Sequence, residues 1–166
     1  MTTPNRFLGF WRSLSDSNQS KAAYLGRALL ADLPASYAVS LALTLITGIH
    51  APRPSTADLP RLFLGLCVVA PIAETFGMAV IIWVLRFVLR RTEYVPWATA
   101  LIWAGLHSLS KPLWGIEIFW SFVIFSLCYL AWEKKSVLQA FWLTVILHSL
   151  HNLVPTLVLL MKQGLF

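Results

Sequence analysis

The sequence predicts an all-α membrane protein, a polytopic bundle of five transmembrane helices preceded by an N-terminal amphipathic helix. Three observations support this class. Of the 166 residues, 58% are hydrophobic and 12% are charged, whereas soluble domains carry about twice that charged fraction. The mean hydropathy is +0.71. Finally, residues 62–85 form an almost wholly apolar run that is long enough to cross the roughly 30 Å hydrocarbon core of a bilayer as a helix.

The N-terminal part is more polar than the rest of the chain. Residues 1–20 form either a loose tail or a short helix on the membrane surface. Residues 21–32 are amphipathic, with Arg27 and Asp32 still charged, and they lead through a bend at Pro34 into a first span over residues 33–49. We therefore divide the chain into a cytoplasmic N-terminal region, residues 1–32, and a transmembrane bundle, residues 33–166.

Proline and charged residues separate the remaining spans. Residues 50–60 contain three prolines and are predicted to form a loop before the second span, residues 62–85. Pro96 suits the first turn of a helix and starts a third span over residues 95–109. The fourth and fifth spans are predicted at residues 113–132 and 137–161, with Pro155 as a kink in the last one.

The distribution of positive charge predicts the orientation, since cytoplasmic loops of membrane proteins are enriched in Lys and Arg. With five spans, nine basic residues fall on the N-terminal side and four on the other, which places the N-terminus in the cytoplasm. The nine are Arg6, Arg12, Lys21, Arg27, Arg86, Arg90, Arg91, Lys134 and Lys135, and the four are Arg53, Arg61, Lys111 and Lys162.

The same positive-inside pattern explains the net charge of +6, so the charge does not indicate nucleic-acid binding. In addition, the sequence contains no basic run with interleaved aromatic residues, which is typical of nucleic-acid-binding proteins. Cys67 and Cys128 both lie in apolar runs and are interpreted as reduced packing residues rather than as a disulfide or metal pair. The polar first twenty residues do not resemble a cleavable signal peptide, so the first span is expected to act as the insertion signal.

Ionisable residues inside the spans are the candidates for function, because a charge at mid-membrane depth costs at least ~2.5 kcal/mol and usually faces a polar partner. Glu74 lies eleven residues from Leu85, His107 twelve from Val95, and His148 eleven from Val137. At 1.5 Å per residue, all three side chains are predicted at a depth of roughly 16 to 18 Å. Three groups from three helices at one depth indicate a single site.

The residue types suggest hydrolysis. A carboxylate and an imidazole from different helices can hold and deprotonate a water, and a second histidine with an amide can stabilise an oxyanion. His148 and Asn152 are four residues apart and share a helix face, whereas His151 lies on that face only partly. His151 is left between a supporting role and interior packing. Glu117, one turn into the fourth span, is interpreted as an interfacial structural residue near Lys111.

These residues also carry a resemblance to a family. The segments APIAETFG (70–77), WAGLH (103–107) and HSLHN (148–152) resemble the motifs of the CPBP or Abi intramembrane proteases, bacterial relatives of the CAAX prenyl endopeptidase. The resemblance implies that Glu74 is the catalytic glutamate, that His107 helps it to activate water, and that His148 and Asn152 stabilise the oxyanion. It also implies a bacterial inner-membrane location and a peptide substrate that is membrane-bound or prenyl-like, a bacteriocin leader, or the C-terminal tail of another protein.

Two positions depart from the family pattern. Thr75 stands where a second Glu is expected, and Ala79 stands where an Arg is expected. Their joint loss keeps the charge balanced and motivates an alternative, a catalytically silent member that acts as a membrane binding or immunity protein or stabilises a partner.

We expect no cofactor and no metal, although Glu74, His107 and His148 form a feasible zinc set. A third alternative uses the histidines as axial ligands of a haem b, which predicts a Soret band in the purified protein.

Overall fold

The structure is a computed structural model that describes residues 11–48 and 59–162, and within these residues it is all-α, as the sequence predicts. Its six α-helices and two short helical segments follow one another as α2 (Lys21–Thr47), α3 (Leu59–Leu64), the π-helix η2 (Gly65–Val69), α4 (Ala70–Val88), the 3₁₀-helix η3 (Thr92–Tyr94), α5 (Val95–Ser110), α6 (Trp114–Trp132) and α7 (Val137–Lys162). Residues 1–10, half of the predicted tail, and most of the predicted loop at 50–60 lie outside the described residues, while residues 11–13 form a helical turn.

Four stretches in the described part of the chain are helical, long and apolar enough to cross a membrane, which supports an integral membrane protein. They are Lys21–Thr47, Pro60–Val88, Trp114–Trp132 and Val137–Val158. The predicted third span corresponds to α5, which has 16 residues and is not among these four. The last three predicted spans match α5, α6 and α7 closely at both ends.

The first helix joins the amphipathic segment and the first span of the sequence interpretation. α2 runs without interruption from Lys21 to Thr47 and contains Pro34, so the predicted boundary at residue 32 falls inside one helix. A proline within a helix removes one backbone hydrogen bond but allows the helix to continue on both sides when packing supports it. The consequence for Asp32 is large, because its side chain lies in the interior and is 0% exposed.

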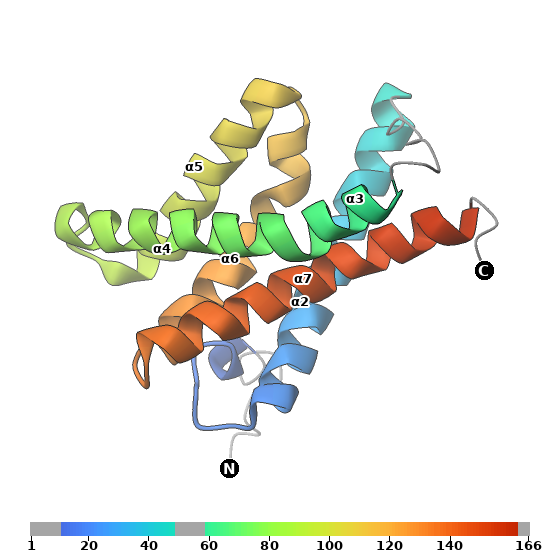
Figure 1. The fold of residues 1–166 in the computed structure, drawn as a ribbon. Coiled ribbons are helices and arrows are strands. Elements are labelled where there is room, and N and C mark those ends of the chain that lie inside the picture. The colour runs from blue at the N-terminus through green and yellow to red at the C-terminus, as the bar shows by residue number, and fades with distance from the viewer. Residues whose placement is uncertain (1–10, 49–58, 163–166) are drawn as a thin grey trace, which may run out of the picture.

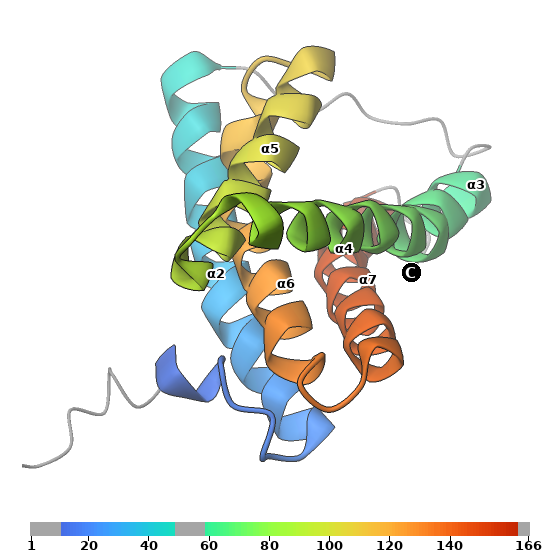
Figure 2. The ribbon, with the colours of Figure 1, turned by 90° about the vertical axis from the view of Figure 1, so that its left-hand side faces the viewer.

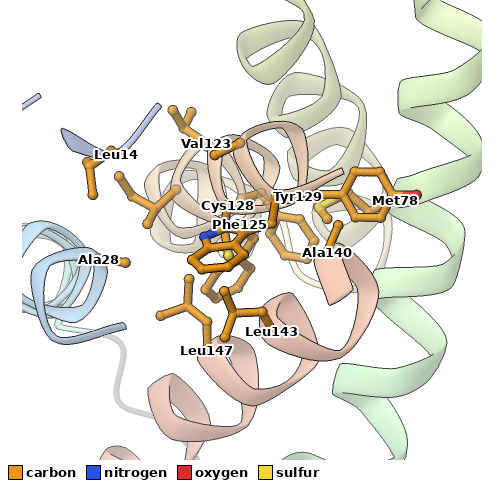
Figure 3. Close-up of a cluster of buried hydrophobic side chains, with 14 of the residues drawn as sticks. Leu14, Ala28, Met78, Val123, Phe125, Cys128, Tyr129, Ala140, Leu143 and Leu147 are labelled. Carbon is orange, nitrogen blue, oxygen red and sulfur yellow. The ribbon is translucent and has the colours of Figure 1, made fainter. Parts of the chain in front are cut away.

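α6 is the central helix, and it packs against α2, α4, α5 and α7. Figure 1 shows α4 and α7 running alongside each other in opposite directions, and crossing α2 and α6 at a steep angle; Figure 2 shows the crossing from the side. Figure 3 shows the apolar core on α6, where Phe125, Cys128 and Tyr129 meet Met78 of α4 and Leu147 of α7. The candidate site lies where these helices cross.

Gly115 allows α5 and α6 to form a close antiparallel hairpin. A Cβ atom at this position would lie 2.1 Å from the carbonyl oxygen of Ala104 and 2.3 Å from the hydroxyl of Ser108. No side chain fits at that distance, so the absence of a Cβ is what allows the two backbones to approach. The neighbouring rings of His107 and Trp114 are 4.7 Å apart, and the close contact thus fixes the end of α5 that carries His107.

Candidate functional site

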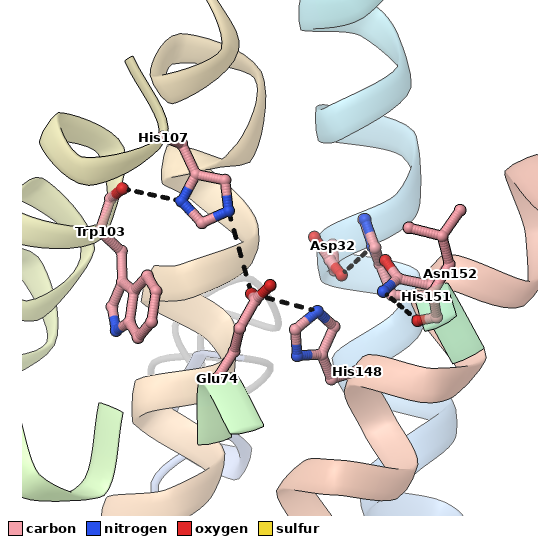
Figure 4. Close-up of polar contacts among 8 residues, drawn as sticks. Asp32, Glu74, Trp103, His107, His148, His151 and Asn152 are labelled. Atoms are coloured by element: carbon pink, nitrogen blue, oxygen red, sulfur yellow. Dashed lines mark hydrogen bonds and ion pairs between the residues drawn. The ribbon is translucent and has the colours of Figure 1, made fainter. Parts of the chain in front are cut away.

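Glu74, His107 and His148 meet between α4, α5 and α7. Oε2 of Glu74 is 4.0 Å from Nε2 of His107 and 3.9 Å from Nε2 of His148. Figure 4 shows both rings turned toward the same carboxylate, each from a different helix. The exposed fractions of the side chains are 24% for Glu74, 12% for His107 and 5% for His148. Three of the four predicted site residues therefore share one location, and their catalytic roles stay predictions.

The hydrogen bonding of His107 defines which ring nitrogen faces the carboxylate. Nδ1 of His107 is 3.0 Å from the carbonyl oxygen of Trp103, one turn earlier on α5. A carbonyl oxygen only accepts hydrogen bonds, so Nδ1 carries the proton that it donates. In the neutral ring Nε2 then has a lone pair directed at Glu74. An ionised carboxylate and this lone pair are both acceptors, so they need a donor between them.

His148 is held mainly by aromatic contacts from α6. Its ring stacks on Phe125 with 4.5 Å between centroids and an interplanar angle of 28°, and it meets the ring of Phe122 edge-on. Since its neighbours restrict the ring from two sides, its Nε2 has a defined direction toward Glu74.

The distances fit a shared water better than direct contact. Separations of 3.9 and 4.0 Å exceed the 2.7–3.2 Å range of direct hydrogen bonds. A water about 2.8 Å from each of two atoms that are 4 Å apart subtends an angle of about 90°, which is close to the bonding geometry of water. Such a water would donate to Glu74 and to the free Nε2 of His107.

A zinc ion fits these atoms less well. Two ligand atoms at about 2.0–2.1 Å from a tetrahedral zinc lie about 3.3 Å apart, which is shorter than the separations around Glu74. Among the described residues, no group of three or more His, Cys, Asp or Glu side chains is placed to hold a metal ion.

Asn152, the fourth predicted residue, is bonded elsewhere. Its Nδ2 donates to the carbonyl oxygen of Leu66 in η2 at 2.8 Å. The sequence explains why this carbonyl needs a donor. The N–H of Ala70 bonds back to Gly65 in the π-helical pattern, and the next donor in that pattern would be Pro71, which has no N–H. Asn152 therefore uses one of its two N–H groups to support the π-helix just before Glu74.

Replacing Asn152 with Ala is expected to destabilise the protein by about 1 kcal/mol, the scale of a side-chain hydrogen bond inside a membrane protein. The loss should be concentrated at residues 65–70, because the Leu66 carbonyl would then lack a donor. Thermal unfolding in detergent and hydrogen exchange of these amides measure both effects. Asn152→Asp places an acceptor against the carbonyl and should destabilise more; equal stability of all three proteins would contradict the assigned bond.

The structure also reveals a buried acid that the sequence analysis did not select. Asp32 on α2 lies 2.7 Å from Nδ1 of His151 on α7, through Oδ2. The signal was present, because Asp32 is near the middle of a 27-residue apolar helix, where an ionisable residue indicates function or a specific partner. The sequence interpretation places Asp32 in the N-terminal region before the first span and so does not consider it as a buried residue. His151, left open by the sequence, is this partner.

The two departures from the family pattern lie on one face of α4, since Thr75 and Ala79 are four residues apart. Thr75 is 1% exposed, and its hydroxyl has no hydrogen-bond partner among the described residues. Ala79 packs against the apolar core and lines a groove of about 740 Å³ between α4, α6 and α7. The two positions at which the motif has charged residues therefore carry no charge in this chain.

The remaining sequence assignments concern structural residues. Cys67 and Cys128 are buried and free, which confirms their interpretation as reduced packing residues. Glu117 is half-buried at the start of α6 near Lys111 and the hydroxyl of Ser40, in keeping with the expected structural role.

Comparisons with protein-family models, with curated proteins and with solved structures give no match to this chain.

Proposed function

We propose that this chain is an intramembrane endopeptidase of the glutamate type, in which Glu74 and His107 activate a water to cleave a membrane-associated peptide. The observation that supports the proposal most strongly is the placement of one carboxylate oxygen 3.9 and 4.0 Å from two imidazole nitrogens on different helices. A carboxylate and two imidazoles in a mostly apolar interior, at a separation that suits a bridging water, are a hydrolytic arrangement. The motif resemblance to the CPBP or Abi proteases agrees with it.

The chemistry follows from the roles of the three side chains. Glu74 accepts a proton from the water, whose position is fixed by the Nε2 lone pair of His107. The resulting hydroxide attacks the carbonyl carbon of the substrate, and the oxygen takes the negative charge. His148, whose Nε2 also faces Oε2 of Glu74, stabilises this oxyanion by donating a hydrogen bond from that nitrogen. Glu74 then returns its proton to the leaving amine as the C–N bond breaks.

Asn152 contributes less to this scheme than the motif implies. One of its N–H groups is engaged with Leu66, which leaves one for an oxyanion. By supporting the π-helix, Asn152 helps to fix the start of α4. It therefore acts on the position of Glu74 indirectly, without touching it. π-Helical turns are frequent at functional sites.

The groove beside Ala79 is a path for an apolar substrate segment. It is lined mainly by apolar and aromatic side chains, including Phe76, Val80 and Trp83 on α4 and Phe141 on α7. Arg86 and Glu133, which form an ion pair, close its end at the last turns of α4 and α6. Glu74 is not among the residues that line the groove, and residues two apart on a helix do not share a face. In this proposal the groove therefore holds the membrane segment of the substrate rather than the bond that is cleaved.

We place five spans in a bacterial inner membrane with the N-terminus in the cytoplasm. α5 is 16 residues long, about 24 Å at 1.5 Å per residue. This is somewhat shorter than the hydrocarbon core, but α5 packs antiparallel along α6, with Trp97 near its start against Trp120. Such a short span can be accommodated by local thinning of the bilayer. The nine-to-four distribution of basic residues then supports the orientation.

The test is hydrolysis in proteoliposomes, with H₂¹⁸O as solvent and membrane-bound peptides of the classes named above as substrates. Wild-type protein should place one ¹⁸O atom in each new C-terminal carboxylate, detected by mass spectrometry. His148→Gln is expected to lower kcat about 10²- to 10⁴-fold. If no labelled product forms while peptides bind the wild type and His148→Gln equally well, the silent alternative, motivated by Thr75 and Ala79, is correct.

A further inference from the structure

A second buried polar cluster joins α2, α6 and α7 beside the candidate site. Oδ2 of Asp32 is 2.7 Å from Nδ1 of His151, and Oδ1 accepts a hydrogen bond of 2.9 Å from the hydroxyl of Ser36. The Ser36 hydroxyl is in turn 2.9 Å from that of Ser121 on α6. Asp32 is 0% exposed and Ser121 2% exposed. Both carboxylate oxygens are thus occupied, which is the condition for keeping a carboxylate buried.

This cluster is connected to the candidate site through one aromatic ring. Phe125 of α6 lies between His148 and His151, which are three residues apart on α7. The ring of His148 stacks on it at 4.5 Å, and the ring of His151 meets it edge-on at 5.7 Å with an interplanar angle of 83°. Figure 4 shows His148 directed toward Glu74 and His151 directed toward Asp32. The two histidines therefore fix the rotation of α7 at neighbouring points.

The rotation of α7 controls the distance from His148 to Glu74. Side-chain atoms lie about 5–6 Å from a helix axis, so a rotation of about 10° displaces such an atom by about 1 Å. A misplacement of about 1 Å at a reacting group can reduce a rate 10²-fold. A charge-assisted hydrogen bond of 2.7 Å to a residue one turn away is well placed to prevent such a rotation.

We propose that Asp32 is a positioning residue, which acts through His151 to hold α7 in the rotation that directs Nε2 of His148 at Glu74. The proposal rests on the proposed function for its effect on catalysis, but its geometric part concerns the two histidines alone. Asp32 touches neither Glu74 nor the predicted substrate path. Its carboxylate also selects the tautomer of His151 that carries the proton on Nδ1.

The variant that tests this is Asp32→Asn, which keeps the volume and one acceptor but removes the charge. In the peptide assay, kcat is expected to fall about 10- to 100-fold with KM changed less than about threefold, because the substrate path is untouched. His151→Gln should give a similar loss of kcat. The double variant should be no worse than either single variant, since both substitutions remove the same bond between Asp32 and His151. Asp16→Asn, a matched change at an exposed position in the N-terminal region, should leave kcat unchanged.

A measurement without substrate separates this proposal from the proposed function. Histidine ¹⁵N spectra of labelled protein in bilayers, with His148 assigned from His148→Gln, should show the resonances of both His151 and His148 shifted in Asp32→Asn and unshifted in Asp16→Asn. If the wild type cleaves nothing but both resonances shift, the proposed function fails and the positioning role stands. If only His151 shifts and kcat is unchanged, Asp32 is a structural residue and the proposal is wrong. Should Asp32→Asn not fold, His151→Gln takes its place, with the His148 resonance as the readout.

Discussion

Glu74→Gln is expected to lower the rate of peptide hydrolysis by about 10³-fold or more, in line with the loss of a general base. Glutamine has the same shape as glutamate and can still bond a water, but its amide cannot accept the proton. Affinity for peptides should change little, because the groove lined by Phe76, Val80 and Trp83 remains. Single-turnover cleavage in proteoliposomes measures the chemical step separately from binding.

The matched control is Glu117→Gln, which removes another half-buried acid from the membrane region. Because the Glu117 side chain interacts with Lys111 and Ser40 rather than with Glu74 or a histidine, its variant should retain wild-type kcat. Glu74→Asp should be intermediate, since a side chain shorter by one methylene moves the carboxylate by more than 1 Å from the bridging position. Equal activity of Glu74→Gln and wild type would remove Glu74 as the base.

Gly115→Ala should have the largest effect on stability, a loss of about 3 kcal/mol, at the upper end of the usual cost of overpacking. The new Cβ would meet the Ala104 carbonyl oxygen at 2.1 Å. That oxygen belongs to the backbone of α5 and cannot move alone, so the α5–α6 hairpin must open. Unfolding by denaturant in detergent measures the loss.

Gly105→Ala is the matched control, because nothing lies within 4 Å of a Cβ at that position in the same helix. Its stability should be unchanged or slightly higher, since alanine is the better helix former. The hairpin also carries His107 next to Trp114. Any Gly115→Ala protein that does fold should therefore show reduced cleavage, whereas Gly105→Ala should not. Equal stability of the two variants would contradict the close packing of α5 on α6.

The meeting of Glu74, His107 and His148 could be predicted from the sequence because depth in a membrane is read directly from distance to a helix end. In the predicted segments each residue is eleven or twelve positions from the cytoplasmic end. In the structure α4 continues to Val88, so Glu74 is fourteen positions from its end, and the agreement in depth is approximate. All-α architecture and the ends of α5, α6 and α7 followed from the positions of proline and charged residues.

Other features depend on details that a hydropathy pattern does not contain. The bond of Asn152 depends on a π-helical turn, in which the Leu66 carbonyl has no backbone donor because Pro71 lacks an N–H. The role of Asp32 depends on α2 continuing past Pro34. Whether a proline ends, bends or merely interrupts a helix is decided by tertiary packing, here the contact with His151.

The most direct test of the water-activating site is an experimental structure in lipid, at a resolution that reveals ordered water. The expected result is a water within about 2.6–3.2 Å of Oε2 of Glu74 and of Nε2 of His107 or His148. A carboxylate that faces only acyl chains or apolar side chains, with no water between it and either imidazole, would contradict the proposed hydrolytic function.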